Sequence, residues 1–196
     1  MLKRLFDIVA SLIGIIILLP FFIIICVMMI VSCGFPLFYI QTRVGKRGKD
    51  FKLFKFRTMH LDSDKKGLLT VGGRDPRVTS IGYYLRKYKI DELPQLVNVL
   101  FGSMSLVGPR PEVRKYVNLY NKEQQAVLSV KPGITDFASL EYINENELLA
   151  QSSEPEQTYI KHIMPQKLGL NLKYIEQQGF LVDVKIIFNT LLKIVK

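Results

Sequence analysis

Cysteine is scarce in this chain of 196 residues: only Cys26 and Cys33 occur, and both lie in one apolar stretch. This usage excludes a disulfide-stabilised framework and fits a reducing environment for the rest of the chain. Internal repeats and low-complexity tracts are also missing. The length then predicts one compact domain plus a membrane anchor.

Acidic residues are outnumbered by Lys and Arg, 17 to 27, which gives a net charge of +10. Such an excess suggests an anionic partner, either nucleic acid, a phospholipid surface or a phosphorylated substrate. The sequence has no recognisable DNA- or RNA-binding motif, and its basic residues lie near apolar segments. We therefore predict no nucleic-acid partner.

Charged residues are absent between Asp7 and Arg43, and residues Leu5 to about Ile40 are predominantly apolar. The stretch is too long for the core of a signal peptide and has no small-residue cleavage site, so it predicts a membrane segment. Pro20 lies inside it, where proline removes a backbone hydrogen bond and is expected to kink the helix.

The two arms on either side of Pro20 are short. Leu5–Leu19 has 15 residues and Phe21–Cys33 has 13, so the arms are roughly 22 and 20 Å long. Neither alone crosses a hydrocarbon core of about 30 Å. Both flanks are basic, with Lys3 and Arg4 before the segment and seven basic residues within 43–57 after it. This favours a re-entrant helix that enters and leaves by the cytoplasmic face, the alternative being one kinked span with the N-terminus outside.

The C-terminal segment repeats apolar residues at helical spacing with lysines beside them. The apolar set is Val184, Ile187, Phe188, Leu191, Leu192 and Val195, and the lysines are Lys185, Lys193 and Lys196. The pattern suits an amphipathic helix in the membrane interface or, equally, a helix packed on the domain's own core.

The predicted fold is mainly α-helical with few short strands, divided into a membrane helix-kink-helix over residues 1–40 and a cytosolic domain over 41–196. A strand is expected near 51–57 and a polar loop over 62–75. The expected helices are 80–88, capped by Thr79 or Ser80, then 95–100 stopped by Gly102, 112–129, 145–151, 165–174 and 183–196.

The adjacent carboxylates Asp91 and Glu92 precede a helix that Pro94 is expected to start. The positive end of that helix favours their ionised forms. Ionised carboxylates suit Mg²⁺, and an ionised Asp can also attack phosphorus. Considered alone, the pair is more often a simple helix cap.

The turn Gly108-Pro109-Arg110-Pro111 presents a guanidinium on a backbone held by two prolines. The planar fork of Arg110 suits phosphate oxygens, although an isolated turn of this kind is more often a solvated surface feature. Further basic groups that could face a diphosphate are Lys55, Arg57, Arg86 and Lys87.

Four motifs together resemble the bacterial sugar transferase family, the small monotopic phosphoglycosyl transferases. They are the runs 55–59 (KFRTM), 91–100 (DELPQLVNVL), 102–111 (GSMSLVGPRP) and 131–135 (KPGIT). The resemblance covers nearly the whole chain, including the apolar N-terminus and residues 180–190.

The resemblance implies a reaction at the cytoplasmic face of a bacterial inner membrane. Asp91 would attack the β-phosphorus of a UDP-sugar, expel UMP and hold a phosphosugar, which polyprenyl phosphate, usually undecaprenyl phosphate, would then accept. It also implies Mg²⁺ at Asp91 and Glu92, a phosphate contact from Arg110, and a re-entrant N-terminal helix. The alternative is an inactive membrane scaffold of a glycan-assembly complex, which the intact Asp91, Glu92 and Arg110 disfavour.

The chain departs from the family pattern in two places. Residues 136–139 (DFAS) stand where many members have GWAQ, and Asn171 stands where many carry an Asp. The role of that Asp is therefore open here. The segment 145–156 is a candidate for donor recognition.

Overall fold

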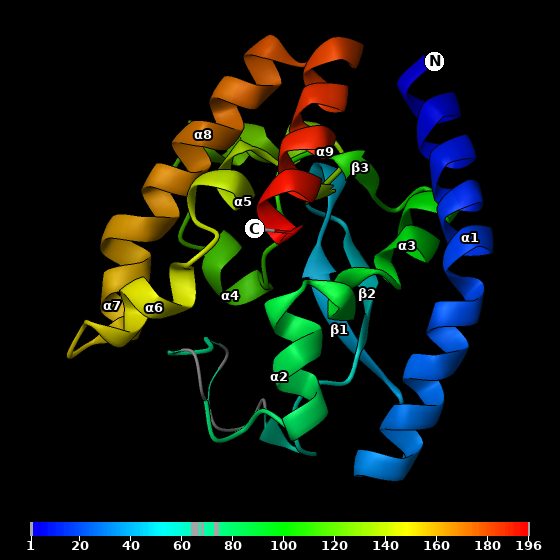
Figure 1. Ribbon diagram of the computed structural model, residues 1–196. Helices are drawn as coiled ribbons and strands as arrows, with labels where there is room; N and C mark the ends of the chain where they lie inside the picture. Colours follow the sequence, from blue (N-terminus) through cyan, green and yellow to red (C-terminus); the bar gives the residue numbers. More distant parts are fainter. Residues whose placement is uncertain (1, 64–66, 68, 73–74, 196) are drawn as a thin grey trace.

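The computed structural model describes residues 2–63, 67, 69–72 and 75–195, and its elements are mainly helical with few short strands. In Figure 1 the long helix α1 runs down one side, α8 lies on the opposite side, and the strands lie between them. The elements are α1 (Leu2–Cys33), β1 (Phe38–Val44), η1 (Lys46–Gly48), β2 (Asp50–Phe56), α2 (Ser80–Lys87), η3 (Ile90–Glu92), α3 (Gln95–Phe101), β3 (Ser105–Val107), α4 (Arg114–Val117), η4 (Gln124–Ser129), β4 (Gly133–Thr135), α5 (Phe137–Glu141), α6 (Glu145–Ala150), α7 (Pro155–Thr158), η5 (Tyr159–Ile163), α8 (Met164–Gln177) and α9 (Phe180–Val195).

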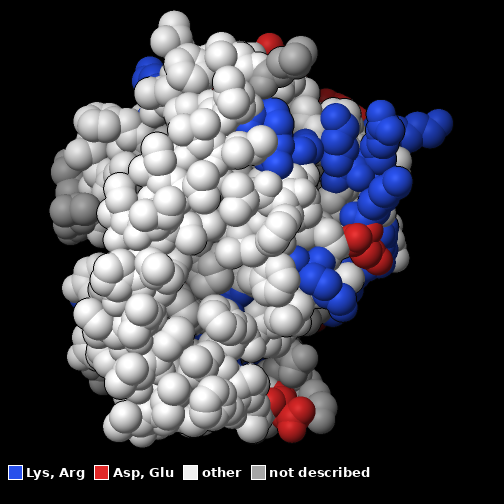
Figure 2. Space-filling view, turned by 90° about the vertical axis from the view of Figure 1, so that its right-hand side faces the viewer, with Lys and Arg blue, Asp and Glu red and all other residues white. Residues whose placement is uncertain are grey.

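Helix α1 is one helix of 32 residues that continues through Pro20, and its ribbon bends about its middle (Figure 1). It is the one helix in the described part of the chain that is long and apolar enough to cross a membrane, with a mean hydropathy of 3.2 over its most apolar window. Only 11% of that window is buried in the protein, and Figure 2 shows a broad uncharged surface on this side of the molecule. The outward face of α1 therefore needs an apolar environment.

The first sheet is a β1–β2 hairpin in which Phe38 pairs with Phe56 and Val44 with Asp50. This confirms the strand predicted near 51–57. The partner strand was not predicted, and it takes the last residues of the apolar stretch, from Phe38, out of the membrane segment.

The second sheet joins β3 to β4 in parallel, with Ser105 opposite Gly133 and Val107 opposite Thr135. Sequence patterns did not predict these strands, because each has only three residues and is paired across a long separation in the chain.

Most predicted helices are confirmed. Thr79 caps α2 by accepting from the Gly82 amide, and Gly102 ends α3 in the left-handed region at φ 86°. The helix predicted over 112–129 is wrong, since α4 ends at Val117 and a separate 3-10 segment begins at Gln124. Asn121 and Gln124 cause the new start, because each side chain bonds the other residue's backbone amide. The loop predicted over 62–75 is confirmed where it is described, residues 64–66, 68, 73 and 74 lying outside the described residues.

Helix α9 divides its apolar residues between two surroundings. Ile186 is buried, and Ile187 packs on the cluster formed by Val107, Tyr174 and Ile186. The exposed residues are Phe180, Leu181, Val184, Phe188, Leu191 and Leu192. One side of the helix therefore packs on the domain, as the prediction of a core-packed helix has it. Another side presents apolar side chains outward, as the prediction of an interfacial amphipathic helix has it.

Candidate active site

Asp91 and Glu92 lie in the 3-10 turn η3, at the wall of a cavity of about 560 Å³. The same cavity is lined by Lys55 from β2, Arg86 from α2 and Arg110 from the turn after β3. The site residues predicted from separate motifs are therefore brought together by the fold. Both carboxylates are buried, with 6% and 8% of their surface exposed.

Glu92 is held between two cations. Arg110 donates from both terminal nitrogens, Nη1 at 3.0 Å to Oε2 and Nη2 to Oε1, and Lys55 Nζ donates to Oε1 at 2.9 Å. Burial alone would raise the pKa of Glu92, but Arg110 and Lys55 together hold that pKa well below its usual range. Glu92 in turn raises the pKa of Arg110. These three side chains form a cluster, the Glu92 clamp, in which burial lowers the pKa of Lys55 against the opposite effect of Glu92.

Asp91 is different from its neighbour. Its carboxylate makes no hydrogen bond or ion pair with any other described residue, although it is buried and lines the cavity. Burial raises the pKa of Asp91, and the charge of Glu92 raises it further against the opposite effect of Lys55. Burial therefore opposes the ionised form of Asp91, which the helix end was predicted to favour for both carboxylates. An unpaired carboxylate beside cations is free to act as a nucleophile or as a ligand.

The turn that carries Arg110 is fixed by close backbone packing. The Gly133 amide donates to Pro109 O at 3.0 Å, and the Gly108 amide donates to Thr135 O at 3.0 Å. A Cβ on Gly133 would lie 2.1 Å from the Gly108 nitrogen, so only glycine permits this approach. The buried carboxylate of Asp136 accepts from the Arg110 amide at 3.1 Å. The conformation that aims Arg110 at Glu92 thus depends on β4.

The other predicted basic residues have separate positions. Arg86 donates to Thr70 Oγ1 at 2.7 Å and lines the cavity. Arg57 also lines it, but its guanidinium donates to the Cys33 and Gly34 carbonyls, both at 2.7 Å, and so caps the end of α1. Lys87 is exposed and lies over the Tyr88 ring, away from the described lining of the cavity.

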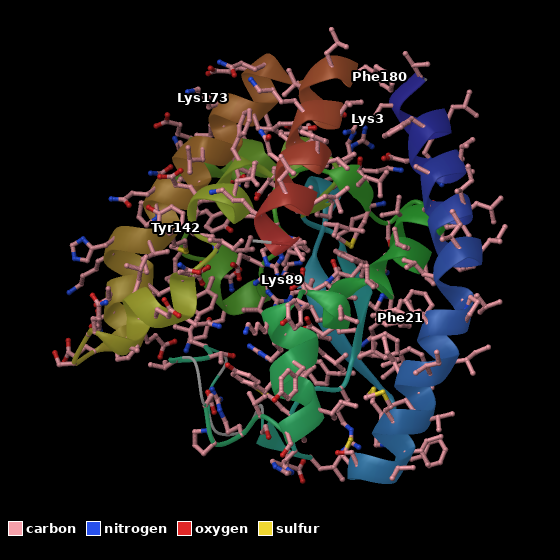
Figure 3. All side chains as sticks on the ribbon, in the orientation of Figure 1. Lys3, Phe21, Lys89, Tyr142, Lys173 and Phe180 are labelled. Atoms are coloured by element: carbon pink, nitrogen blue, oxygen red, sulfur yellow. The ribbon has the colours of Figure 1, made fainter. Side chains whose placement is uncertain are left out.

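Helix α1 is docked on α3, which follows η3, and on β3, which leads into the Arg110 turn. Arg4 donates to the Val99 and Leu100 carbonyls at the end of α3, at 2.6 and 2.8 Å. Asp7, 3% exposed, accepts from the Leu106 amide of β3 at 3.0 Å. Lys3 donates to the carboxylate of Asp183 at 2.5 Å, and Figure 3 shows Lys3 beside Phe180 at the start of α9. Lys3 and Arg4 are therefore docking residues, besides being the flanking charges considered from sequence.

Several cavity residues were missed from sequence. Lys89 adopts a left-handed conformation at φ 55° directly before η3, and Figure 3 shows it in the middle of the molecule, between α2 and α9. Its charge lowers the pKa of both Asp91 and Glu92. Lys167 also lines the cavity and pairs with Glu145 at 2.6 Å. Of the predicted donor-recognition segment 145–156, Glu145 and Asn146 are the members found among the described lining residues. Non-glycine residues at positive φ give no reliable sequence signal, so Lys89 was not found from the sequence.

Asn171 lies outside this cavity. Its side chain is buried on α8, and its Oδ1 has no hydrogen-bond partner in the described part of the protein. It lines a small separate cavity of about 20 Å³ that also touches Arg110.

Metal-ligating groups are few at the site. The described residues include no group of three or more His, Cys, Asp and Glu side chains placed to hold a metal ion. Asp91 and Glu92 are two carboxylates at one cavity wall, which is enough for a cation that takes its other ligands from phosphates and water.

Comparison with known proteins gives a consistent result. The sequence profile described as "Bacterial sugar transferase" matches residues 1–196. A Bacillus subtilis protein provisionally named an undecaprenyl-phosphate N-acetylgalactosaminyl 1-phosphate transferase is 45% identical over 122 residues, 62% of this chain and 68% of that protein. An uncharacterized sugar transferase of the same organism is 37% identical over 202 residues, 98% of this chain and 87% of that protein. The UDP-glucose:undecaprenyl-phosphate glucose-1-phosphate transferase of Escherichia coli is 34% identical over 197 residues, 98% of this chain but 40% of that protein.

Proposed function

The chain belongs to the bacterial sugar transferase family, and we propose that it transfers a sugar 1-phosphate from a UDP-sugar to a polyprenyl phosphate. The names of its relatives support this reaction, since they describe transfer of glucose 1-phosphate or N-acetylgalactosamine 1-phosphate to undecaprenyl phosphate. Because the relatives differ in their sugar, the sugar is left to experiment.

The observation that carries the proposal is the contrast between the two neighbouring carboxylates. Glu92 is neutralised by Arg110 and Lys55, whereas Asp91 faces the same cavity without a partner among the described side chains. Phosphoryl transfer depends mostly on positioning and charge neutralisation. The Glu92 clamp supplies cations beside a free nucleophile, which is the arrangement this chemistry requires.

We assign the covalent role to Asp91. One of its carboxylate oxygens bonds to the β-phosphorus of the donor, and the bond from that phosphorus to the bridging oxygen breaks, so that UMP leaves with the bond electrons. The phosphosugar is then an acyl phosphate on Asp91. A phosphate oxygen of the acceptor attacks the same phosphorus, and the carboxylate leaves with its electrons, giving the polyprenyl diphosphate sugar.

Mg²⁺ is part of the proposal, with Asp91 and Glu92 as the residues that would hold it. When bound, it supplies neutralisation of charge on the transferred phosphoryl group. The unpaired Asp91 carboxylate fits this role directly, and Glu92 fits it if it shares an oxygen with Lys55 or Arg110. The same two cations orient Glu92 for that contact.

The membrane arrangement is proposed from α1. Its exposed apolar face, the basic residues Lys3 and Arg4 in its first turn and the seven basic residues within 43–57 that follow it support a re-entrant α1 (Leu2–Cys33). The catalytic domain, predicted over 41–196, would then lie on the cytoplasmic side. A site on such a domain would lie at the level of the lipid headgroups, where polyprenyl phosphate is found. A tag at either terminus should then be labelled only from the cytosol, and labelling of an N-terminal tag from the periplasm would overturn the re-entrant arrangement.

The reaction is tested by assaying UMP release from a panel of UDP-sugars, with and without polyprenyl phosphate. We expect one donor to give stoichiometric UMP without acceptor and continuous turnover with it. Mass spectrometry of the protein mixed with that donor alone should show a phosphosugar adduct on Asp91. Release of UMP by the Asp91→Asn variant at the wild-type rate would refute the assignment of the nucleophile.

A further inference from the structure

The cavity at the candidate site has an apolar wall that the donor does not require. Besides the charged residues, its lining includes six aliphatic side chains contributed by β3, β4, α5 and α9. They are Leu106, Ile134, Leu140, Ile187, Leu191 and Ile194. A UDP-sugar presents phosphates, hydroxyls and a polar base, so an aliphatic wall of this kind indicates a second, apolar ligand.

Helix α9 connects this wall to the charged end of the cavity. Thr190 Oγ1 lies 2.7 Å from Thr135 Oγ1 at the end of β4. The next residue, Asp136, holds the backbone amide of Arg110. The middle of α9 is therefore tied to the turn that carries the Glu92 clamp, and its lining residues belong to the same site.

The spacing of the α9 residues makes a continuous stripe. Ile187, Leu191 and Ile194 recur at intervals of four and three residues, so they lie along one face of the helix. Ile187 is packed on the domain, whereas Leu191 is 58% exposed while still lining the cavity. The stripe thus runs from the interior of the cavity to its mouth, next to the outward apolar face that Phe188 and Leu192 form.

We propose that this stripe of α9 binds the isoprenoid chain of the acceptor where the chain leaves its phosphate. The inference rests on the proposed function and adds a binding site to it. A polyprenyl phosphate joins an anionic head to an apolar chain, and this cavity joins cations at Lys55, Arg86 and Arg110 to an aliphatic wall that opens at Leu191. The phosphate reaches Asp91 while the chain follows α9 outward into the bilayer.

The neighbouring residue Leu192 provides a matched control. It is 46% exposed on the same helix and is not among the described residues that line the cavity. Leu191→Ser and Leu192→Ser remove the same aliphatic group from the outer surface, so they weaken any general membrane contact of α9 to a similar extent. Only the first removes a group from the proposed chain site.

The experiment uses the full-length enzyme in nanodiscs, with the active donor and undecaprenyl phosphate. We expect Leu191→Ser to raise the KM for undecaprenyl phosphate about tenfold, as loss of one aliphatic side chain that the bound isoprenoid would cover implies. Leu192→Ser should change it less than twofold. Stoichiometric UMP release without acceptor should equal the wild-type value in both variants. With a two-isoprene acceptor, whose chain ends near the cavity, Leu191→Ser should raise KM as it does with the long chain.

Three outcomes would overturn the inference. Equal increases in KM for the two variants would assign Leu191 to membrane contact, and an unchanged KM in Leu191→Ser would leave the stripe without a role in acceptor binding. A loss of UMP release without acceptor would place Leu191 in the donor site. Failure of the proposed function is distinguished from all three, because the wild-type enzyme would then release no UMP from any donor.

Discussion

Exchanging each of the two carboxylates for its amide should change stability in opposite directions. Glu92→Gln removes the negative charge between Arg110 and Lys55, so two partly buried cations are left without their counter-ion. Breaking a buried pair costs about 3–5 kcal/mol. We expect the lower end, about 3 kcal/mol, because the Arg110 side chain is 32% exposed and solvent screens it in part.

Asp91→Asn should leave the protein equally stable or more so. Asp91 has no partner to lose among the described residues, and the raised pKa shows that burial disfavours its charge. Relief of such a charge falls within the gains of roughly 1 kcal/mol common for changes at strained functional sites. Activity should move the other way, since removal of a nucleophile lowers turnover by a factor on the order of 10⁴ or more.

The assay is thermal unfolding in one detergent, alongside UMP release. In a chain of this length about 1 kcal/mol shifts Tm by about 2–4 °C, so Glu92→Gln should unfold about 6–12 °C below wild type and Asp91→Asn about 2–4 °C above it. Glu156→Gln is the control for the chemical change. Its partner Lys115 is on the surface, and both side chains are at least 50% exposed, so Tm should move by about 1 °C. Equal downward shifts for Glu92→Gln and Asp91→Asn would refute the contrast between the two carboxylates.

Four further predictions concern pH, backbone packing, helix docking and metal. Burial raises the pKa of Asp91 in the folded protein, so its ionisation lowers stability in full above that pKa, progressively less between that pKa and the ordinary value of 3.8, and not at all below 3.8. In EDTA, the Tm advantage of Asp91→Asn should therefore shrink as pH falls from 8 to 4, and a constant difference would contradict this. Gly133→Ala should lower UMP release at least about tenfold by displacing the Arg110 turn, whereas Gly169→Ala, with open space around its Cβ, should leave it unchanged. Asp7→Ala should lower Tm by an amount equivalent to about 3 kcal/mol, because the Leu106 amide and the Ser105 hydroxyl lose a charged acceptor; a Tm within 1 °C of wild type would show that α1 docks without it. Chelation by EDTA should stop UMP release and added Mg²⁺ should restore it, while activity that persists in EDTA would remove Mg²⁺ from the proposal.

Local structure was predicted well wherever neighbouring residues supply the signal. Thr79 accepts from an amide three residues away, and Gly102 ends a helix by its own left-handed conformation, so both boundaries follow from short sequence patterns. The predicted helix over 112–129 failed for a related reason. The prediction rested on the spacing of apolar residues and did not consider the reciprocal hydrogen bonds between the side chains and backbone amides of Asn121 and Gln124, which start a new segment.

The sequence predicted which residues belong to the site, but not how their side chains contact one another. Motifs identified Asp91, Glu92, Arg110, Lys55 and Arg86, all of which line one cavity. The sequence also suggested Lys87, which is exposed and is not among the described lining residues, and it gave no means of distinguishing the two carboxylates. That distinction depends on Arg110 and Lys55 reaching Glu92 from other elements.

The sequence by itself determined the uncharged apolar segment, the capped helices and the identity of the charged residues. Each of these features depends only on residues that are consecutive or spaced by a helical turn. Tertiary structure decided that Glu92 is neutralised and Asp91 is not, that Arg57 caps α1, and that α9 lines the same cavity as both carboxylates. These outcomes depend on contacts between residues far apart in the chain, such as Thr135 with Thr190 and Gly108 with Gly133. A pattern of neighbouring residues does not predict such contacts. Which side chain pairs with a buried charge depends on which backbone segments pack closely enough to bring that side chain within reach.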